Sequence, residues 1–493
     1  MSQRVSINQL ATGVPGLDAI LGGGLPEFSF NLIAGQPGSG KTTLAHQLMF
    51  ALASRERRAL YFTVLGEPPL KMLRYQQQFG FFEAGRIGDT IRFVNLAEDV
   101  ASGRFDQVLA RILKEVEAFS PGLVFVDSFR SILLEAEPRA KGALSPQQFI
   151  QQLGVQLSSW QATTFLIGED PSEHDTHPVF TVADGLLCLR QSVYRNSMVR
   201  KIQVLKLRGQ AASPGIHTFR ITGDGIEVFP AAAVPGDTEG GPSAAPVPPR
   251  AGRLAMGVPG LDEMLGGGLP SGYSLLVAGP SGSGKTILAT AFLAEGVRRG
   301  EPGVIVAFEQ NPSQSWTRTL DDLVRGGRIG LINTRLLDLS IDEIVQRLID
   351  LIHHMKATRV VIDSLSGFEL AVAPTFREDF RESLFRMVSV LSGLGVTVLM
   401  TSELEDRYGD LRFSPNGAAF LTDAIIVQRY VELNSRLDRV MAVVKVRGSA
   451  HSSELRQYEI SAEGISIGAP VAGYGGLLSG RPMPVPPPGP ARR

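Results

Sequence analysis

Two hydrophobic patterns alternate along the chain. Short runs that are apolar at nearly every position are separated by longer amphipathic stretches. The short runs lie at 30–35, 59–65, 123–128 and 163–168, and again at 273–279, 303–308, 359–364 and 396–402. A strand that is apolar throughout suits a parallel sheet covered by helices on both faces. The pattern therefore predicts an α/β protein with two mainly parallel sheets, each flanked by helices.

The sequence also contains an internal repeat of two copies. GVPGLDAILGGGLP at 13–26 returns as GVPGLDEMLGGGLP at 257–270, and GQPGSGKT from Gly35 returns as GPSGSGKT from Gly279. Both pairs are displaced by 244 residues (257 − 13 and 279 − 35). LVFVDS in the first copy corresponds to VVIDS in the second, and KLRG corresponds to KVRG, in the same order along the chain. Four ordered blocks indicate two homologous domains.

Composition separates these domains from their connections. The stretch between the copies is rich in Pro, Gly and Ala and nearly free of large apolar residues, which is typical of a flexible linker. We predict a first domain at 1–229, a linker at 230–252, a second domain at 253–470 and a Pro- and Gly-rich tail at 471–493. The tail is interpreted either as a disordered end or as a docking peptide.

Charge and cysteine content narrow the class of protein. With 48 Lys+Arg against 49 Asp+Glu, no global field draws the chain to nucleic acid or to an anionic membrane. The single cysteine, Cys188, excludes an intrachain disulfide and a multi-cysteine zinc site. We find no membrane-spanning apolar run and no signal-peptide pattern, so we expect a cytoplasmic protein without a membrane partner.

Each glycine-rich segment follows an apolar strand and precedes a helical run, as a phosphate-binding loop does. Glycines let backbone N–H groups surround an anion at the positive end of the next helix. Lys41 and Lys285 are predicted to reach the β- and γ-phosphates of ATP, and Thr42 and Thr286 to bind Mg²⁺. The predicted ATP-binding residues are Gly35, Gln36, Pro37, Gly38, Ser39, Gly40, Lys41, Thr42 and Thr43, and Gly279, Pro280, Ser281, Gly282, Ser283, Gly284, Lys285, Thr286 and Ile287. The alternative is a glycine-rich turn, which two matches in register disfavour.

Four further carboxylates are candidates: Asp127 and Asp363 for metal binding, and Glu309 and Glu67 for catalysis. Asp127 and Asp363 end apolar strands, where an aspartate stands beside bound Mg²⁺; the alternative is a cap on the next helix. A hydrolase also needs a base for water, and Glu309 ends a strand in the second copy. The first copy has Leu65 at the matching position, with Glu67 two residues further on.

The last repeated block carries paired cations. Lys206 and Arg208, and likewise Lys445 and Arg447, stand two residues apart at the end of what we take to be each domain's final strand, so they point to one face. We expect them to act on a neighbouring subunit's γ-phosphate; the alternative is a solvated basic strand end. The histidine pairs 174/177 and 353/354 lack the other ligands of a metal site.

Together these residues resemble the KaiC family of tandem RecA-like ATPases. The resemblance covers both GVPGLD…GGGLP leaders, both phosphate loops, both Asp-Ser strands, both Lys-x-Arg-Gly segments and the linker. It implies two RecA-like P-loop domains, a double-ring homohexamer, ATP at the subunit interfaces and Lys-x-Arg acting in trans.

The chain departs from the family's pattern in two places. Where the family has adjacent glutamates, the second domain has Glu309-Gln310 and the first has Leu65-Gly66. Where the family carries a Ser-Thr phosphorylation pair, this chain has Ala419 and Phe420, which have no hydroxyl, so autokinase activity there is chemically impossible. Whether Thr422 accepts a phosphoryl group instead stays open at this point.

The function expected from this resemblance is that of a ring-shaped, ATP-hydrolysing signalling switch. A clock-related role is one form that this function can take. The sequence does not identify the partner protein that the switch would act on. One alternative is a DNA-directed RecA-like ATPase of the recombinase or helicase class, but the segments after Ser128 and Ser364 lack an aromatic and basic pattern. The other is a nucleotide-gated scaffold without catalysis.

Overall fold

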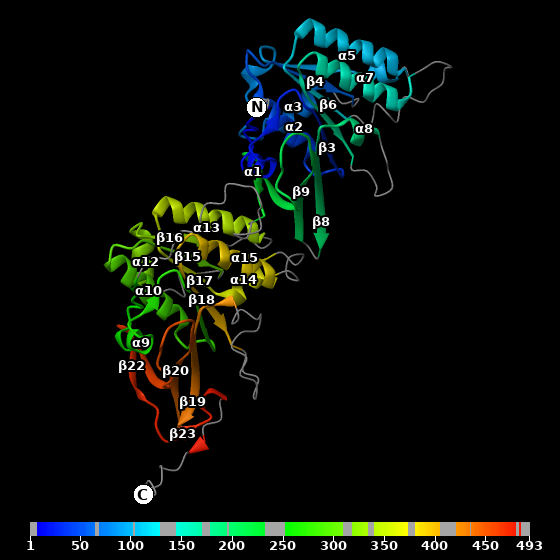
Figure 1. Cartoon of the computed structure of the whole chain (residues 1–493). Coiled ribbons are helices and arrows are strands. Elements are labelled where there is room, and N and C mark those ends of the chain that lie inside the picture. The colour runs from blue at the N-terminus through cyan, green and yellow to red at the C-terminus, as the bar shows by residue number, and fades with distance from the viewer. Residues whose placement is uncertain are drawn as a thin grey trace, which may run out of the picture. The chain divides into compact units, whose positions relative to one another are not determined.

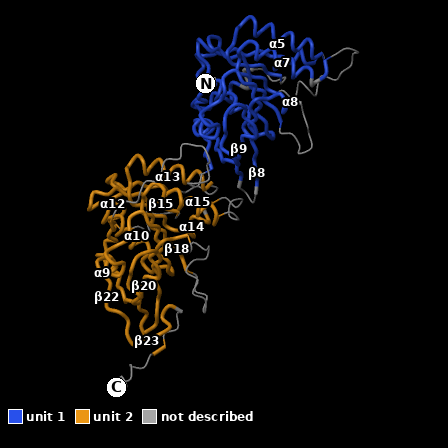
Figure 2. Tube along the Cα trace, viewed as in Figure 1, with its two compact units in different colours: residues 1–231 blue, residues 232–493 orange. Residues whose placement is uncertain are grey.

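The computed structural model divides into two compact units, residues 1–231 and 232–493 (Figure 2). The residues that the model describes are 7–64, 69–101, 104–128, 144–169, 178–194, 197–231, 252–308, 318–333, 340–372, 380–404, 421–433, 435–479 and 483–484.

The first unit is built on a sheet whose described strands number nine, in the order β11-β10-β9-β8-β3-β7-β6-β4-β5. Its neighbouring strands β8 and β9 run side by side (Figure 1). These strands are β3 (Phe30–Gly35), β4 (Ala59–Thr63), β5 (Ile91–Asn95), β6 (Leu123–Asp127), β7 (Thr163–Gly168), β8 (Gly185–Tyr194), β9 (Ser197–Leu207), β10 (His217–Thr222) and β11 (Gly225–Phe229). Pairing is parallel from β5 to β8 and antiparallel from β8 to β11. A separate pair, β1 (Gln9–Leu10) and β2 (Leu25–Pro26), flanks the leader helix.

The second unit repeats this topology. Read from its other edge, its sheet has the order β22-β21-β20-β19-β14-β18-β17-β15-β16, which is the first sheet strand for strand. Its strands are β14 (Ser274–Gly279), β15 (Gly303–Ala307), β16 (Ile329–Asn333), β17 (Arg359–Asp363), β18 (Thr397–Glu403), β19 (Ala424–Leu433), β20 (Arg436–Val446), β21 (Arg456–Ser461) and β22 (Gly464–Pro470), with the small pair β12 (Arg253–Leu254) and β13 (Leu269–Pro270). Two tandem RecA-like domains, each a mainly parallel sheet flanked by helices, are therefore confirmed.

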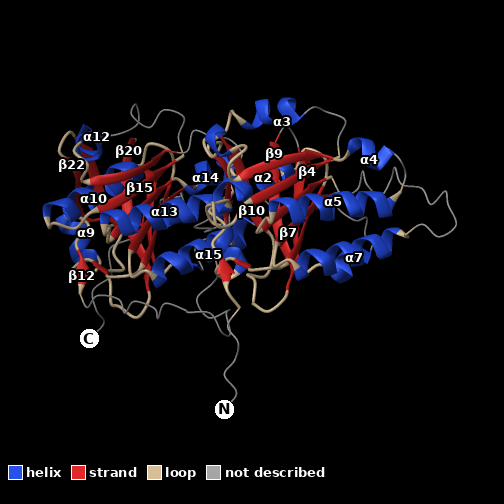
Figure 3. Cartoon of the chain, turned by 90° about the horizontal axis from the view of Figure 1, so that it is seen from above, coloured by secondary structure: helices blue, strands red, loops and turns tan. Residues whose placement is uncertain are grey.

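Helices cover both faces of each sheet (Figure 3). In the first unit they are α1 (Leu17–Leu21), α2 (Lys41–Leu52), α3 (Pro69–Gln76), α4 (Ala97–Ala101), α5 (Phe105–Phe119), α7 (Pro146–Ser159) and α8 (Pro178–Val182), with a 3-10 turn η1 (Ala84–Arg86). In the second unit they are α9 (Pro259–Met264), α10 (Lys285–Arg298), α12 (Arg318–Arg325), α13 (Ile341–Met355), α14 (Leu365–Ala371) and α15 (Phe380–Gly393). Among the described residues, no helix is long and apolar enough to cross a membrane.

Strand β4 explains why the strands are apolar at every position. Leu60 and Phe62 pack on one face of the sheet in the cluster that contains residues of α5 and α7. Tyr61 points to the other face and packs in the cluster that contains residues of α2. Because successive side chains alternate between the faces and both faces are covered, no position faces water.

Two features of the structure concern the ends of the predicted domains: the strands that follow the Lys-x-Arg-Gly segments, and the elements after residue 470. The strands before Lys-x-Arg-Gly, β9 and β20, are not the final ones, because β10 and β11, and β21 and β22, follow them. After residue 470 the chain forms β23 (Tyr474–Gly475), η3 (Leu477–Ser479) and β24 (Met483–Pro484), and Leu477 packs in a cluster with Val431 and Val440. The predicted linker lies outside the described residues from 232 to 251.

Candidate functional site

The two glycine-rich loops join a central strand to a helix in both units: β3 to α2, and β14 to α10. Gly40 and Gly284 stand directly before these helices with φ of 102° and 96°, a conformation that L side chains rarely adopt. A Cβ on Gly40 would also lie 2.9 Å from Ile221 Cδ1. The backbone therefore needs glycine at this position, so that the loop can turn its N–H groups toward the helix N-terminus.

Each loop lysine folds back over its own loop. Lys41 Nζ donates to the carbonyl oxygens of Gly35 and Gln36 at 2.8 and 2.9 Å. Lys285 Nζ donates to those of Gly279 and Pro280 at 2.9 and 2.8 Å. Both ammonium groups therefore lie at the mouth of the loop, where a phosphate can replace the carbonyl contacts.

Threonine and aspartate meet at both loops. Thr42 Oγ1 donates to Asp127 Oδ2 at 2.8 Å, and Thr286 Oγ1 donates to Asp363 Oδ2 at 2.8 Å. Both carboxylates are buried. In the second unit the cap on α14 is Ser364, whose Oγ accepts from Gly367 N, rather than Asp363.

The surroundings of these groups shift their proton affinity. Burial raises the pKa of the Asp127 carboxyl, and the hydroxyls of Thr42 and Tyr61, together with the charge of Lys41, oppose the rise. Burial lowers the pKa of the Lys285 ammonium, and the charges of Glu403 and Asp363 oppose that fall. The site thus places cationic and anionic groups together in a setting where each stabilises the other's charge.

In each sheet, the paired cations lie at the end of the central strands that is opposite to the loop. Strand β9 runs antiparallel to β8, and its end at Leu207 pairs with Gly185, which in turn pairs with Asn31 near the start of β3. The loop begins at Gly35, the other end of β3. A strand rises about 3.3 Å per residue, so about 15 Å of β3 separates the cations from their own loop.

Local contacts hold these cations. Lys206 Nζ donates to the Phe180 and Thr181 oxygens at 3.1 and 3.2 Å, and Arg208 Nη2 donates to the Thr181 oxygen at 3.2 Å. The two side chains therefore lie on the same side, where both reach the Thr181 carbonyl oxygen. Burial and the neighbouring arginine, Arg208 or Arg447, lower the pKa of Lys206 and of Lys445 respectively.

Sequence reasoning missed several residues at these sites. Asp184 and Asp423 pair with Arg208 and Arg447 at 3.1 and 3.6 Å. Glu403 ends β18 near Lys285, and Glu169 directly follows the matching strand β7. A signal for all four existed, since each recurs at the matching place in the other copy. No such signal marks Tyr61 or Thr401, which hydrogen-bond to Asp127 and Asp363.

Several predicted residues lie outside the described part of the chain: Glu67 and Leu65, Glu309 and Gln310, Ala419 and Phe420, and the histidine pair 174/177. Thr422 is described, and its side chain is fully buried. His353 and His354 stand in the last turn of α13, and no group of three or more potential metal ligands occurs among the described residues.

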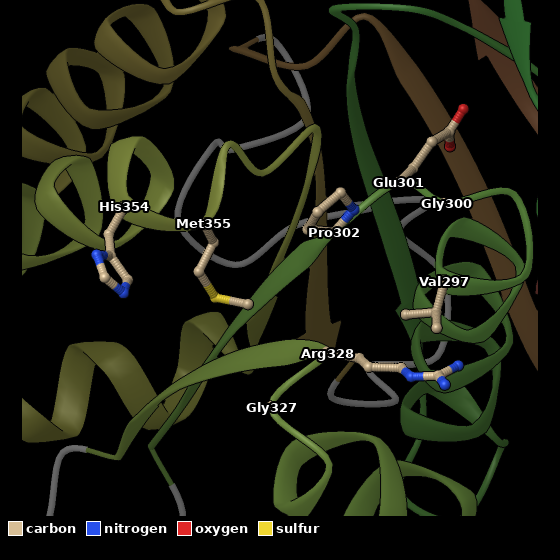
Figure 4. Close-up of a pocket in the computed structure, with 8 residues that line it drawn as sticks. All are labelled: Val297, Gly300, Glu301, Pro302, Gly327, Arg328, His354 and Met355. Atoms are coloured by element: carbon tan, nitrogen blue, oxygen red, sulfur yellow. The ribbon is translucent and has the colours of Figure 1, made fainter.

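A cavity of about 500 Å³ opens at the other end of the second sheet (Figure 4). Glu301 and Arg328 precede β15 and β16, and His354 and Met355 end α13. These are the amino ends of parallel strands, whereas the glycine-rich loop follows a carboxyl end. The cavity is therefore separate from the phosphate-loop site.

A glycine-rich loop between the central strand and its helix, with an aspartate at the end of a nearby strand, occurs in both sheets and defines a tandem P-loop ATPase of the RecA-like class. The KaiC ATPase family model matches residues 10–233 and, a second time, residues 254–472. The chain therefore belongs to the KaiC family.

Curated relatives match almost the whole chain. The circadian clock oscillator protein KaiC of Picosynechococcus sp. is 27% identical over 97% of this chain and 92% of its own length. The circadian clock oscillator protein KaiC 1 of Synechocystis sp. is 28% identical, with 97% and 92% covered. The circadian clock protein KaiC3 of the same genus is 27% identical, with 97% and 95% covered. The likeness is thus spread over both domains.

Proposed function

We propose that this KaiC-family ATPase is a nucleotide-driven signalling switch that works as a homohexameric ring. The observation that carries the proposal is the separation, within each domain, of a complete phosphate loop from the Lys-x-Arg pair by the length of β3. A cation that cannot reach its own loop completes a site only when a second copy of the chain brings it there.

The described residues fit Mg-ATP at both loops. Lys41 and Lys285, which contact carbonyl oxygens of their own loops, would hold the β- and γ-phosphates. Thr42 with Asp127, and Thr286 with Asp363, would hold Mg²⁺, and a bound Mg²⁺ would neutralise charge on the phosphates. Hard oxygen donors of this kind are the ligands that Mg²⁺ prefers.

Ring assembly should depend on nucleotide. Light scattering of the full chain with saturating Mg-ATP should give the mass of about six subunits, the closed ring that a heterologous interface permits. The chain without nucleotide is the control. A monomer under saturating Mg-ATP contradicts the proposal.

We further propose that the two domains divide their labour. The first has its loop, Asp127 and Lys206/Arg208, but Leu65 and Gly66 stand where the family has glutamates, whereas the second retains Glu309. A general base contributes about 10²–10⁴-fold in rate, so the first ring should hold ATP as the assembly platform while the second hydrolyses it.

Two variants separate these roles. Lys41→Ala should disrupt the hexamer, whereas Glu309→Gln should abolish most phosphate release and leave the ring intact. Glu67→Gln is the matched control. If Glu67→Gln removes the activity and Glu309→Gln retains it, the first domain is the catalytic one. If neither changes phosphate release, both glutamates are idle and the assignment of a catalytic glutamate is wrong.

Other outcomes would change the class of function. An absence of steady-state phosphate release favours a nucleotide-gated scaffold. A salt-sensitive shift of labelled single-stranded DNA at micromolar protein favours a DNA-directed motor. The clock-related role rests only on the relatives' names, and a pull-down with ATP against ADP tests for the partner that reads the ring.

A further inference from the structure

We propose that Tyr61 in the first domain and Thr401 in the second are positioning residues, which hold the metal-binding aspartate of their own domain from different neighbouring strands. The inference rests on the proposed Mg-ATP sites and assigns to each a residue outside the loop motif.

In the first domain the donor comes from β4. Tyr61 Oη donates to Asp127 Oδ2 at 2.9 Å, and Thr42 donates to the same oxygen. The Tyr61 side chain is fully buried. Its ring lies 5.8 Å from the Phe125 ring, 5.3 Å from the Phe93 ring and 4.7 Å from the His46 ring, measured between centroids. These contacts fix the direction in which the hydroxyl points.

In the second domain the donor comes from β18, on the other side of the aspartate strand. Thr401 Oγ1 donates to Asp363 Oδ1, while Thr286 donates to Oδ2. Thr401 is also fully buried. Both carboxylate oxygens of Asp363 therefore receive a hydroxyl donor, whereas the two donors to Asp127 share one oxygen.

The strand registers show that each domain has an apolar residue where the other has its donor. Tyr61 pairs with Phe125 as Ile305 pairs with Val361, so Ile305 occupies the position of Tyr61. Ile33 pairs with Ile167 as Val277 pairs with Thr401, so Ile167 occupies the position of Thr401.

This exchange indicates what the hydroxyls are for. Ile305 and Ile167 demonstrate that packing alone requires no hydroxyl at either position. A hydroxyl buried without a partner is unfavourable, whereas one that donates to a carboxylate stabilises the anion and fixes its orientation. Among the described residues, each domain has one such extra hydroxyl donor, placed on a different strand. The shared property is a metal-binding aspartate whose orientation is fixed by a hydroxyl group from a neighbouring strand.

The first test uses the full chain with Lys285→Ala, so that a fluorescent ATP analogue reports the first site. The readout is the Mg²⁺ concentration that gives half-maximal nucleotide binding at one fixed pH. Tyr61→Phe should raise it about tenfold or more, since a hydrogen bond to a charged group is typically worth that factor. Nucleotide binding without Mg²⁺ should not change, because the phenyl ring keeps the packing.

A rescue distinguishes orientation from packing. Adding Ile167→Thr to Tyr61→Phe supplies a hydroxyl from the β7 side, as Thr401 does in the second domain, and should bring the Mg²⁺ requirement back toward the parent value. Ile167→Thr in the parent chain is the matched control and should change the requirement little.

The second domain gives an independent test in the full chain with Lys41→Ala. Thr401→Val should raise the Mg²⁺ requirement of the second site, and Thr401→Ser, which keeps the hydroxyl, should not. Failure of the unsubstituted chain to bind nucleotide overturns the proposed function itself. Normal binding with an unchanged Mg²⁺ requirement in Tyr61→Phe and Thr401→Val, or equal losses with and without Mg²⁺, overturns only the positioning roles.

Discussion

Arg208 is bound to Asp184 of its own domain: its Nη1 donates to Asp184 Oδ1 at 3.1 Å. Asp184 Oδ2 also accepts from Phe30 N at 3.0 Å, which ties the arginine to the start of β3. Asp423 repeats the arrangement, 3.6 Å from Arg447. Each arginine is thus held at the end of the central strands away from its own loop, by contacts that are partly exposed.

Removal of these arginines should affect catalysis more than binding. Arg208→Ala or Arg447→Ala should slow hydrolysis at the sites that the arginine completes more than it weakens nucleotide binding, because such a cation acts mainly on transition-state charge. Since the second domain is proposed to provide most of the turnover, the large fall in phosphate release, about 10³-fold, is expected for Arg447→Ala. Phosphate release and nucleotide-binding titrations measure the two effects. Arg436→Ala, at the start of β20, the strand that Arg447 directly follows, is the matched control and should leave both unchanged. Equal losses in binding and hydrolysis contradict a role in the transition state.

Incubation with labelled ATP should leave little stable phosphate on the chain. Ala419 and Phe420 have no hydroxyl, and the side chain of Thr422 is fully buried. Mass spectrometry of the ATP-treated protein checks this, with Thr422→Val as the control for any label found. Phosphate on Thr422 would restore a kinase activity and strengthen the clock-related role.

His46 should make the first domain less stable in acid. Burial lowers the pKa of its imidazole from 6.5 to about 4, although the Gln76 amide opposes the fall, and among the described residues neither ring nitrogen has a partner of full hydrogen-bond geometry. As pH falls below about 6.5 the unfolded chain takes up a proton that the folded chain does not, so stability decreases until about pH 4.

The expected loss of unfolding free energy through His46 between pH 7 and pH 5 is about 2 kcal/mol. Urea unfolding at the two pH values measures it, and His46→Leu should reduce the difference by about that amount. His353→Leu, at an exposed position, is the control and should retain the parent's pH dependence. An unchanged difference in His46→Leu would contradict the assignment.

The second domain should depend on an ion pair whose arginine is buried. Arg359 has no exposed side-chain surface; its Nη2 lies 2.7 Å from Glu301 Oε2, and its Nη1 donates to the Ala255 and Phe292 oxygens at 2.8 Å. Glu301→Ala leaves the guanidinium buried without its carboxylate, which should cost about 3–5 kcal/mol of unfolding free energy.

A surface pair provides the control for this change. Glu454→Ala removes the partner of the more exposed Arg456 and should cost about 0–1 kcal/mol. Adding Arg359→Leu to Glu301→Ala should recover much of the loss, since Leu123 occupies the matching position in the first domain. Equal effects of Glu301→Ala and Glu454→Ala in urea unfolding would contradict a structural role for the pair.

The sequence by itself determined the duplicated fold, both loops and the Thr-Asp pairs. These features depend on local chemistry: glycines that permit positive φ, a helix that starts at the loop, and apolar runs that have to be buried on both faces. Asp127 and Asp363 were predictable because each ends such a run, and the sheet brings each to the loop threonine.

Only the tertiary structure decided which side chains surround these groups. The length of β3 and the antiparallel pairing of β8 with β9 separate Lys206 and Arg208 from their own loop, and nothing near them in the sequence encodes that distance. Tyr61 and Thr401 read as ordinary buried strand residues, since their role depends on which strands lie beside the aspartate. Strand order is a non-local property of the packed sheet, so the same hydroxyl contact could come from β4 in one copy and from β18 in the other.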